Sequence, residues 1–350
     1  MGTPEFAVES LKRLVEGGYN VVAVVTQPDK PVGRHQDTLQ PSQVKQYAVE
    51  HGLPVLQPVK MKNPEFVEQL RSYQADLQVV VAFRMLPEVV WAMPKFGTFN
   101  VHAALLPQYR GAAPINWAVI NGEKETGVTT FFLDHDIDTG RIIMQKRFPI
   151  PESADVEYVY DGLMHLGADL ALETIDALIA AGGNIESMPQ EKLIGEGVEL
   201  KSAPKIFKET CRIDFHKLAK QVYDFVRGLS PYPGSWTEIK KKAPVVIFED
   251  ADGEMPEATA HPAQQKSAAK IQVLKIFKTS LTEFSRGVAP VGSLRVFEKK
   301  LQVACLDQWL NIEELQLSGK KRMDAAAFLN GMKDIAYYEC QKAQETEEEW

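Results

Sequence analysis

The feature that most constrains the fold is the alternation of short, β-branched apolar runs with helical patterns in the first half of the chain. The apolar runs, which we expect to be strands, lie at residues 21–26, 77–82, 98–102 and 126–133. The helical patterns between them lie at 41–51, 63–72 and 113–121. Val-rich strands separated by helices are typical of a mostly parallel sheet covered on both faces.

Two further patterns complete this half. Residues 141–150 follow the preceding strand closely, which predicts an antiparallel hairpin at the edge of the sheet. Residues 157–181 form a long amphipathic pattern that Gly182 and Gly183 end, as expected of a helix stop. A length of 350 residues then leaves room for a second domain.

The regular alternation of strand and helix patterns ends after residue 183. Residues 184–203 have no clear period and are expected to be a linker between a first domain, 1–183, and a second, 204–343, before an acidic tail at 344–350. Short strand candidates in the second domain, separated by Pro, Gly and charged residues, lie at 236–240, 245–248, 271–277 and 301–304. This pattern favours a small β-barrel or a sandwich.

Composition excludes several other classes. With 45% hydrophobic and 25% charged residues, the chain is an ordinary globular sequence and not a disordered or coiled-coil one. No apolar run reaches the roughly 18–20 residues that a membrane span needs, and the first residues lack a signal or transit pattern. Three widely separated cysteines, Cys211, Cys305 and Cys340, favour a reducing compartment. We therefore expect a cytoplasmic protein.

The net charge of −8 hides an asymmetry. Residues 1–200 carry 16 Lys and Arg against 26 Asp and Glu, whereas residues 201–350 carry 23 against 21, and four of those acids lie in the tail. Such a division can mark a polyanionic partner for the second half. Charge alone, however, favours two ordinary solvated surfaces.

Asn100 and His102 are the first candidate site. They lie two residues apart at the carboxyl end of a predicted strand, so both side chains share one face. Ligands of open α/β sheets bind at this end of the strands. An amide beside an imidazole, with no adjacent Ser or Cys nucleophile, suits polarisation of a carbonyl group. The alternative is a hydrogen-bonded histidine that closes the strand.

The second candidate is Asp138, in an Asp-rich loop that follows another apolar strand. This loop lacks the Gly and Glu positions of an EF-hand, a second Asp-Thr-Gly segment as in aspartic proteases, and zinc-ligand spacing. What remains is a carboxylate at a Gly turn on a strand end, or simply an Asp that caps the turn. We expect no metal.

These residues resemble the methionyl-tRNA formyltransferase family. Its long central motif is similar to Asn100-Val101-His102 and to the stretch Leu105-Leu106-Pro107-Gln108-Tyr109-Arg110-Gly111-Ala112-Ala113-Pro114-Ile115. Its catalytic Asp-Thr-Gly resembles Asp138-Thr139-Gly140. Residues 1–8 and 26–31 resemble its opening elements, and residues 213–215 and 227–234 its C-terminal module. The resemblance therefore covers nearly the whole chain.

The resemblance implies an α/β fold, with a Rossmann-like, mostly parallel first domain and a smaller OB-like β-barrel. It also implies formyl transfer from 10-formyltetrahydrofolate to the α-amino group of methionyl initiator tRNA, by a monomeric enzyme. Asn100, His102 and Asp138 would be the catalytic residues. From their types, Asn100 and a protonated His102 would donate hydrogen bonds to the developing oxyanion, while Asp138 favours the charged imidazole and helps move the amine proton.

The same resemblance assigns the binding residues. The folate site would be lined by Ala104, Leu105, Leu106 and Pro107, with a second wall of Phe83, Arg84, Met85, Leu86 and Pro87. Arg34 would approach the acceptor stem of the tRNA. Arg227 belongs to the matched motif of the second domain, whose positive face would hold the tRNA backbone.

The chain departs from the family at four places. Ala104 stands where the family usually has Ser, Arg84 where it often has Gly, and the loop after Arg34 lacks the usual lysines. Met1 falls where the family already has most of its first strand behind it. We expect either a start further upstream or a sheet that lacks a central strand.

Three alternatives stay open. One is another folate-dependent formyltransferase, with a sugar nucleotide or a ribotide as acceptor. Another is a hydrolase of formyltetrahydrofolate, and the third is a catalytically inactive tRNA-binding protein. The second domain favours tRNA over the other acceptors.

Overall fold

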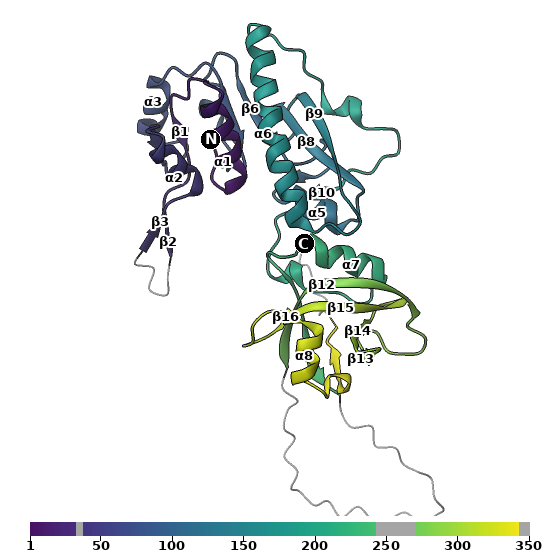
Figure 1. Cartoon of the computed structure of the whole chain (residues 1–350). Helices are drawn as coiled ribbons and strands as arrows, with labels where there is room; N and C mark the ends of the chain where they lie inside the picture. Colours follow the sequence, from purple (N-terminus) through teal and green to yellow (C-terminus); the bar gives the residue numbers. More distant parts are fainter. Residues whose placement is uncertain (33–37, 243–270, 343–350) are drawn as a thin grey trace, which may run out of the picture. The chain divides into compact units, whose positions relative to one another are not determined.

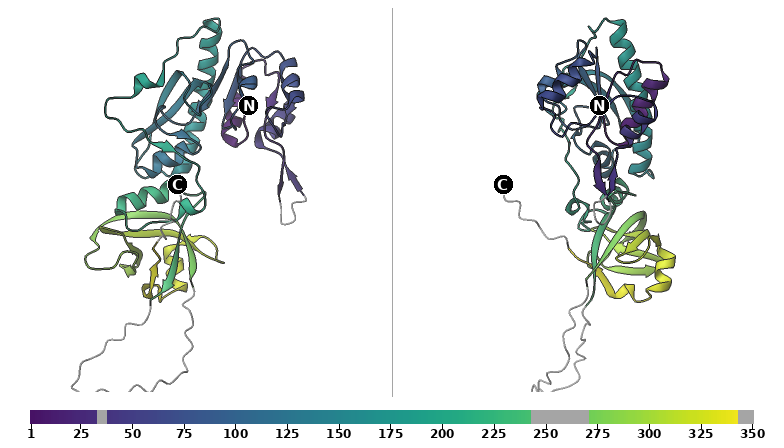
Figure 2. Two further views of the ribbon diagram at one scale, coloured as in Figure 1. Left: turned by 180° about the vertical axis from the view of Figure 1, so that it is seen from behind. Right: turned by 90° about the vertical axis from the view of Figure 1, so that its left-hand side faces the viewer.

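The computed structural model describes residues 1–32, 38–242 and 271–342, which form two compact units, Met1–Ile206 and Phe207–Trp350 (Figure 1). Figure 2 shows the same ribbon from two further directions. Three features expected from the sequence lie outside the described residues: Arg34, the strand at 245–248 and the tail at 344–350.

The main sheet of the first unit has the order β5-β6-β8-β9, with bounds β5 (Gln78–Val81), β6 (Thr98–His102), β8 (Glu125–Phe132) and β9 (Ile142–Pro149). β5 and β6 are parallel, while β8 is antiparallel to both β6 and β9. The expected antiparallel hairpin at 141–150 is present. β1 (Val24–Val25) and β4 (Val55–Leu56) form a further parallel pair.

Met1 and Gly2 lie between these two sets of strands. Gly2 forms a parallel bridge with Val81, and its N–H donates to the carbonyl oxygen of Val25 at 3.0 Å. The N–H of Val81 in turn donates to the carbonyl oxygen of Met1 at 2.9 Å. Two residues, Met1 and Gly2, therefore occupy the position of the central strand. They connect the parallel pair β1–β4 to the parallel pair β5–β6. The Rossmann-like, mostly parallel class predicted from the sequence is confirmed.

Helices cover both faces of this sheet, because successive strand residues point to opposite sides. Val24 and Val81 belong to a core shared with α1 (Glu5–Glu16), α2 (Gln43–Glu50) and α6 (Val156–Ala180). Their neighbours Val25 and Val80 belong to a second core, shared with α3 (Pro64–Ser72) and α4 (Glu88–Trp91). Successive apolar residues of these strands thus pack into the cores on the two opposite faces of the sheet.

The helix boundaries follow local capping chemistry. Ser42 and Asn63 accept hydrogen bonds from backbone N–H groups in the first turns of α2 and α3. Asp155 does the same for α6, and the chain leaves that helix through Gly182 and Gly183, both with positive φ. No helix in the described part of the chain combines the length and the apolar character needed to cross a membrane.

The segment expected to be a linker packs onto the first unit. Met188 and Ile142 form an antiparallel bridge with two backbone hydrogen bonds of 2.8 Å. Further along, β10 (Ser202–Ala203) pairs in parallel with β7 (Arg110–Gly111). We call residues 184–206 the connector. It lacks an apolar period because it is held by backbone hydrogen bonds instead of by one buried face.

The second unit is a barrel with the strand order β13-β14-β15-β12-β11-β17. Its elements are α7 (Ala219–Gly228), β11 (Ser235–Lys241), β12 (Gln272–Ser285), β13 (Leu294–Phe297), β14 (Lys300–Ala304), β15 (Gln308–Leu317), β16 (Met323–Asp324), α8 (Ala325–Gly331) and β17 (Tyr338–Cys340). An antiparallel bridge between Ser293 and Glu339 joins the two ends of the sheet. The expected OB-like barrel is confirmed.

No segment predicted from the sequence covers α7, β13, β15, β16, α8 or β17. β15 carries polar side chains such as Asn311 and Glu314 between its apolar ones, and α7 shares only its last two residues with the motif at 227–234. All three cysteines are buried thiols in this unit, and burial raises the pKa of Cys305 and of Cys340 to about 12. They are therefore protonated, and not nucleophilic, at neutral pH.

Thr129, in the middle of β8, fixes the turn that follows β6. Its buried hydroxyl donates to the carbonyl oxygen of Ala104 at 2.6 Å and accepts from the N–H of Leu106 at 3.1 Å. The side-chain amide of Gln145 donates to the hydroxyl oxygen of Thr129 at 2.9 Å. One hydroxyl thus satisfies polar groups of the turn and of β9. Thr126, on the same strand, is also buried, but its hydroxyl has no partner among the described residues.

This pair of threonines gives a matched test. Thr129→Val should lower the free energy of unfolding by about 1–3 kcal/mol, because the variant leaves buried polar groups without their partner. Thr126→Val should be neutral or stabilising, since it removes a buried hydroxyl that makes no hydrogen bond. Urea unfolding followed by circular dichroism measures both. Equal losses in the two variants would contradict the assigned role of Thr129.

Candidate active site

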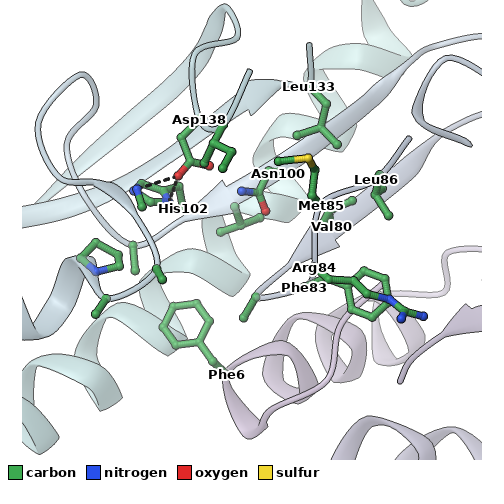
Figure 3. Close-up of a pocket in the computed structure, with 18 of the residues that line it drawn as sticks. Phe6, Val80, Phe83, Arg84, Met85, Leu86, Asn100, His102, Leu133 and Asp138 are labelled. Atoms are coloured by element: carbon green, nitrogen blue, oxygen red, sulfur yellow. Dashed lines mark hydrogen bonds and ion pairs between the residues drawn. The ribbon is translucent and has the colours of Figure 1, made fainter. Parts of the chain in front are cut away.

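Asn100 and His102 enter a single cavity from the carboxyl end of β6. The cavity has a volume of about 610 Å³, and Asp138 also lines it (Figure 3). The spacing of two on the strand therefore places the amide and the imidazole as the sequence predicts. The Oδ1 atom of Asn100 is buried and has no hydrogen-bond partner among the described residues. A polar atom of this kind in a cavity is available to a ligand.

The two ring nitrogens of His102 have different environments. Nε2 lies 2.9 Å from the main-chain carbonyl oxygen of Tyr109, and because a carbonyl only accepts, Nε2 carries a hydrogen. Nδ1 lies 3.7 Å from Oδ2 of Asp138. The ring is 6% exposed. A second proton on His102 would therefore sit on Nδ1, beside the carboxylate and the cavity.

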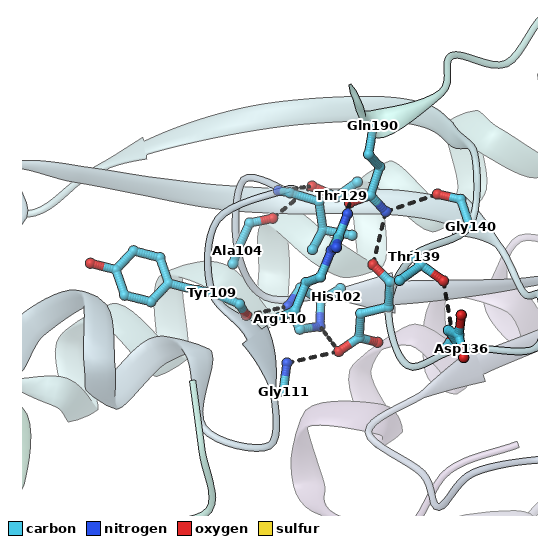
Figure 4. Close-up of polar contacts among 12 residues, drawn as sticks. His102, Ala104, Tyr109, Arg110, Gly111, Thr129, Asp136, Thr139, Gly140 and Gln190 are labelled. Carbon is cyan, nitrogen blue, oxygen red and sulfur yellow. Dashed lines mark hydrogen bonds and ion pairs between the residues drawn. The ribbon is translucent and has the colours of Figure 1, made fainter. Parts of the chain in front are cut away.

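Asp138 is held by the backbone on the opposite side. Its Oδ2 accepts the N–H of Gly111 at 2.9 Å, so this one oxygen faces both an amide donor and the imidazole (Figure 4). Asp138 has a left-handed backbone, with φ of 56°, a conformation that Asp tolerates better than most residues. Gly111 has φ of 127°, and a Cβ atom there would lie 2.4 Å from the carbonyl oxygen of Ala203.

The Asp that caps the turn is Asp134, and not Asp138. Oδ1 of Asp134 accepts the N–H of Asp136 at 3.1 Å and the hydroxyl of Thr139 at 2.7 Å. The alternative that an Asp of this loop caps the turn is thus true of Asp134. Asp138 instead faces His102.

Apolar side chains form the far part of the cavity. Of the predicted second wall, Phe83, Arg84, Met85 and Leu86 line the cavity, and Pro87 is not among the lining residues. Leu133 also lines this part, near Met85 (Figure 3). The guanidinium of Arg84 turns back to the carbonyl oxygens of Pro58 and Val59. This part of the cavity therefore offers mainly apolar surface to a ligand.

The predicted first wall has a different position. None of Ala104, Leu105, Leu106 and Pro107 is among the residues that line the cavity. Ala104 and Leu106 are buried, with Ala104 fully so, and the turn they form is bonded to Thr129. The four residues belong to the chain that leads from His102 to Tyr109, and their part in folate binding stays a prediction.

Arg227 lies inside the second unit, where its side chain is 8% exposed. Its Nε donates to Oδ1 of Asp224 at 2.7 Å, and Lys220 pairs with the same carboxylate. The sequence motif around Arg227 therefore marks a structural ion pair instead of a surface cation. Within the described residues, no group of three or more His, Cys, Asp or Glu side chains could hold a metal ion.

Sequence reasoning did not find the backbone partners of the site. Tyr109 and Gly111 lie in the motif stretch, but their main-chain contacts with His102 and Asp138 carry no sequence signal of their own. The phenol of Tyr109 donates to Glu123 at 2.6 Å, and its N–H donates to the carbonyl oxygen of Lys201 at 2.7 Å. The connector thus fixes Tyr109 through Lys201, and Tyr109 in turn bonds His102 through its carbonyl oxygen.

Comparison with known proteins places this geometry in a family. Residues 1–175 match the family described as formyl transferase, and residues 205–333 match the formyl transferase C-terminal domain. The structure is similar to WlaRD, a sugar 3N-formyl transferase (TM-score 0.57, 19% identity, 91% of this chain and 97% of that chain). It is also similar to an N-formyltransferase from Helicobacter canadensis (TM-score 0.54, 21% identity, 89% and 96%). At these identities the likeness shows the fold alone.

Closer relatives exist in sequence. The methionyl-tRNA formyltransferase of Parabacteroides distasonis is 56% identical over 339 residues, which is 97% of this chain and 96% of that one. The enzyme of the same name from Phocaeicola vulgatus is 58% identical over 332 residues, 95% and 94% of the two chains. With both domains matched and this identity over nearly its full length, the chain belongs to the methionyl-tRNA formyltransferase family.

Proposed function

We propose that this protein transfers the formyl group of 10-formyltetrahydrofolate to the α-amino group of methionyl initiator tRNA. The observation that carries the proposal is the convergence of Asn100, His102 and Asp138 at one end of a cavity with an apolar far wall. Relatives that are more than half identical over nearly the whole chain bear the name of this activity. The other formyltransferase acceptors have only fold-level likeness behind them.

The cavity fits the folate co-substrate in its chemistry. Phe83, Met85 and Leu86 offer the apolar surface against which the pteridine ring would lie. Oδ1 of Asn100 is a buried acceptor without a partner among the described residues, so the amide has hydrogen-bonding capacity for the reacting groups. We place the formyl group between Asn100 and His102.

The side chains divide the work of transfer. As the amine nitrogen bonds to the formyl carbon, the carbonyl oxygen gains negative charge, and the amide of Asn100 stabilises it by donating a hydrogen bond. His102 holds or moves a proton at Nδ1, because Nε2 is committed to the carbonyl oxygen of Tyr109. Asp138 stabilises the positive imidazole and helps remove the proton of the amine. The C–N bond to the folate then breaks as its nitrogen takes up a proton.

The second unit supplies a surface for the tRNA. Exposed lysines lie at two places in the barrel: Lys299, in a turn, is followed by Lys300 at the start of β14, and Lys320 and Lys321 follow β15. Arg295 lies over the ring of the buried Trp309, 3.9 Å from the ring centre, so an aromatic side chain holds this cation in place. We propose that phosphate contacts come from such exposed groups, in place of the buried Arg227.

The enzyme would act as a monomer in the cytoplasm, where both substrates occur.

Substitution of Asn100 and of His102 tests the chemistry. Asn100→Ala and His102→Ala should each lower kcat by about 10²–10³, the usual cost of removing one stabilising donor or proton carrier. Binding of the tRNA should change by less than about twofold, since neither residue lies in the barrel. Labelled 10-formyltetrahydrofolate and charged initiator tRNA give the rate, and filter binding gives the affinity.

His51→Ala is the matched control for these variants, because His51 is an exposed histidine stacked on Tyr47, away from the cavity. Its kcat should equal that of the original protein. If the folded original protein forms no formyl-methionyl product, the proposed activity is wrong. Release of formate without transfer would identify a hydrolase, and tRNA binding without either reaction an inactive binding protein.

Salt dependence tests the tRNA surface. Affinity for the tRNA should fall about tenfold or more between 50 and 200 mM salt, the loss expected when two or three phosphates are neutralised. The variant Lys320→Glu with Lys321→Glu should weaken binding and reduce the slope of affinity against salt, while kcat at saturating tRNA stays the same. A slope near zero in the original protein would contradict a phosphate-binding surface.

A further inference from the structure

Gln190 is a fully buried polar side chain that no step of the proposed reaction uses. It begins the 3-10 helix η1 (Gln190–Leu193) within the connector and has no exposed surface. Its Nε2 group donates to the main-chain carbonyl oxygens of Asp138 and Gly140, both at 2.8 Å. Two hydrogen bonds from one amide thus hold the chain on both sides of Thr139 (Figure 4).

The other end of this amide is also committed. Oε1 of Gln190 accepts from Nε and Nη2 of Arg110, at 3.1 and 2.7 Å. Since carbonyls only accept and a guanidinium only donates, these four contacts fix which end of the amide is oxygen. Only an amide, with donors and an acceptor on one rigid group, matches this set of partners.

Arg110 lies between the two backbone groups that hold the site. Tyr109 on one side presents its carbonyl oxygen to His102, and Gly111 on the other donates its N–H to Asp138. Gln190 therefore links, from behind, the loop that carries Asp138 to the segment that fixes both Asp138 and His102. Asp138 has a left-handed backbone, with φ of 56°, and its carbonyl oxygen is one of the two that Gln190 holds.

We propose that Gln190 is a positioning residue for formyl transfer, which sets the separation of the Asp138 carboxylate and the His102 imidazole without touching substrate. The role rests on the proposed function, because it acts through these two residues. A displacement of about 1 Å in reacting groups costs on the order of 10² in rate. Substrate binding depends on other walls of the cavity and on the barrel, so it should be spared.

The first test is the variant Gln190→Leu, which keeps the volume and removes all four hydrogen bonds. We expect kcat to fall about 10–100-fold, with KM for 10-formyltetrahydrofolate and for the charged tRNA within about twofold of the original values. Gln190→Glu covers the case in which the leucine variant does not fold. Its carboxylate still accepts from Arg110 but cannot donate to Asp138 and Gly140, so the same loss of kcat is expected.

Arg141→Met is the matched control. Arg141 also ties the connector to this region, because its guanidinium donates to the hydroxyl and carbonyl oxygens of Ser187 and not to Asp138. We expect its kcat to stay within about twofold of the original. If Arg141→Met lowers kcat as much as the Gln190 variants do, general docking of the connector explains the effect and the proposal is wrong.

Hydrogen exchange gives a readout that needs no activity. The N–H of Gly111 is protected by its bond to Asp138, so its exchange should accelerate at least about tenfold in the Gln190 variants, while amides of the core strand β8 keep their rates. Unchanged exchange at Gly111, or an unchanged kcat, overturns the proposal. If the original protein does not formylate tRNA, the proposed function fails, and exchange at Gly111 alone decides the role of Gln190.

Discussion

The site depends on the hydrogen bond from the N–H of Gly111 to Oδ2 of Asp138. This bond, at 2.9 Å, places a carboxylate from one loop beside an imidazole from a neighbouring strand. A backbone donor to a charged acceptor is stronger than a neutral pair, and it cannot rotate away as a side chain can. The approach is close because Gly111 has no Cβ atom, which lets the chain pass against Ala203.

The sheet explains why these groups meet. β6 lies between β5, to which it is parallel, and β8, to which it is antiparallel. Its carboxyl end therefore borders the loop after β5, which contains Met85. Asn100 and His102 project from this border into the cavity. The loop after β8 begins beside the amino end of β6, where Phe132 pairs with Phe99, and folds back so that Asp138 reaches His102. Strand order thus supplies the apolar wall, whereas the polar cluster also needs the contacts that hold this loop.

Much of the first unit could be predicted from the sequence. The bounds of β6 agree with the expected strand at 98–102, and the caps at Ser42 and Asn63 lie where local chemistry places them. A period of two is enough to put Asn100 and His102 on one face. These are short-range properties, set by residues that are neighbours along the chain.

The rest could not be predicted because it depends on contacts between distant residues. Gln190 meets Asp138 across 52 positions, in a stretch that has no period. Arg227 has the residue type of a phosphate ligand, and only its contact with the buried Asp224 shows that it is structural. The turn at Ala104 belongs to the family motif, yet its bond to Thr129 lies behind the cavity wall.

The connector has a consequence for where the chain can be divided. A fragment that ends at residue 183 would contain Asn100, His102 and Asp138, together with every strand of the main sheet. It would still lack the edge strand β10 beside Gly111 and the amide that braces Asp138. A fragment that keeps the support of Gly111 and Asp138 must therefore run to about residue 206, where the first compact unit ends.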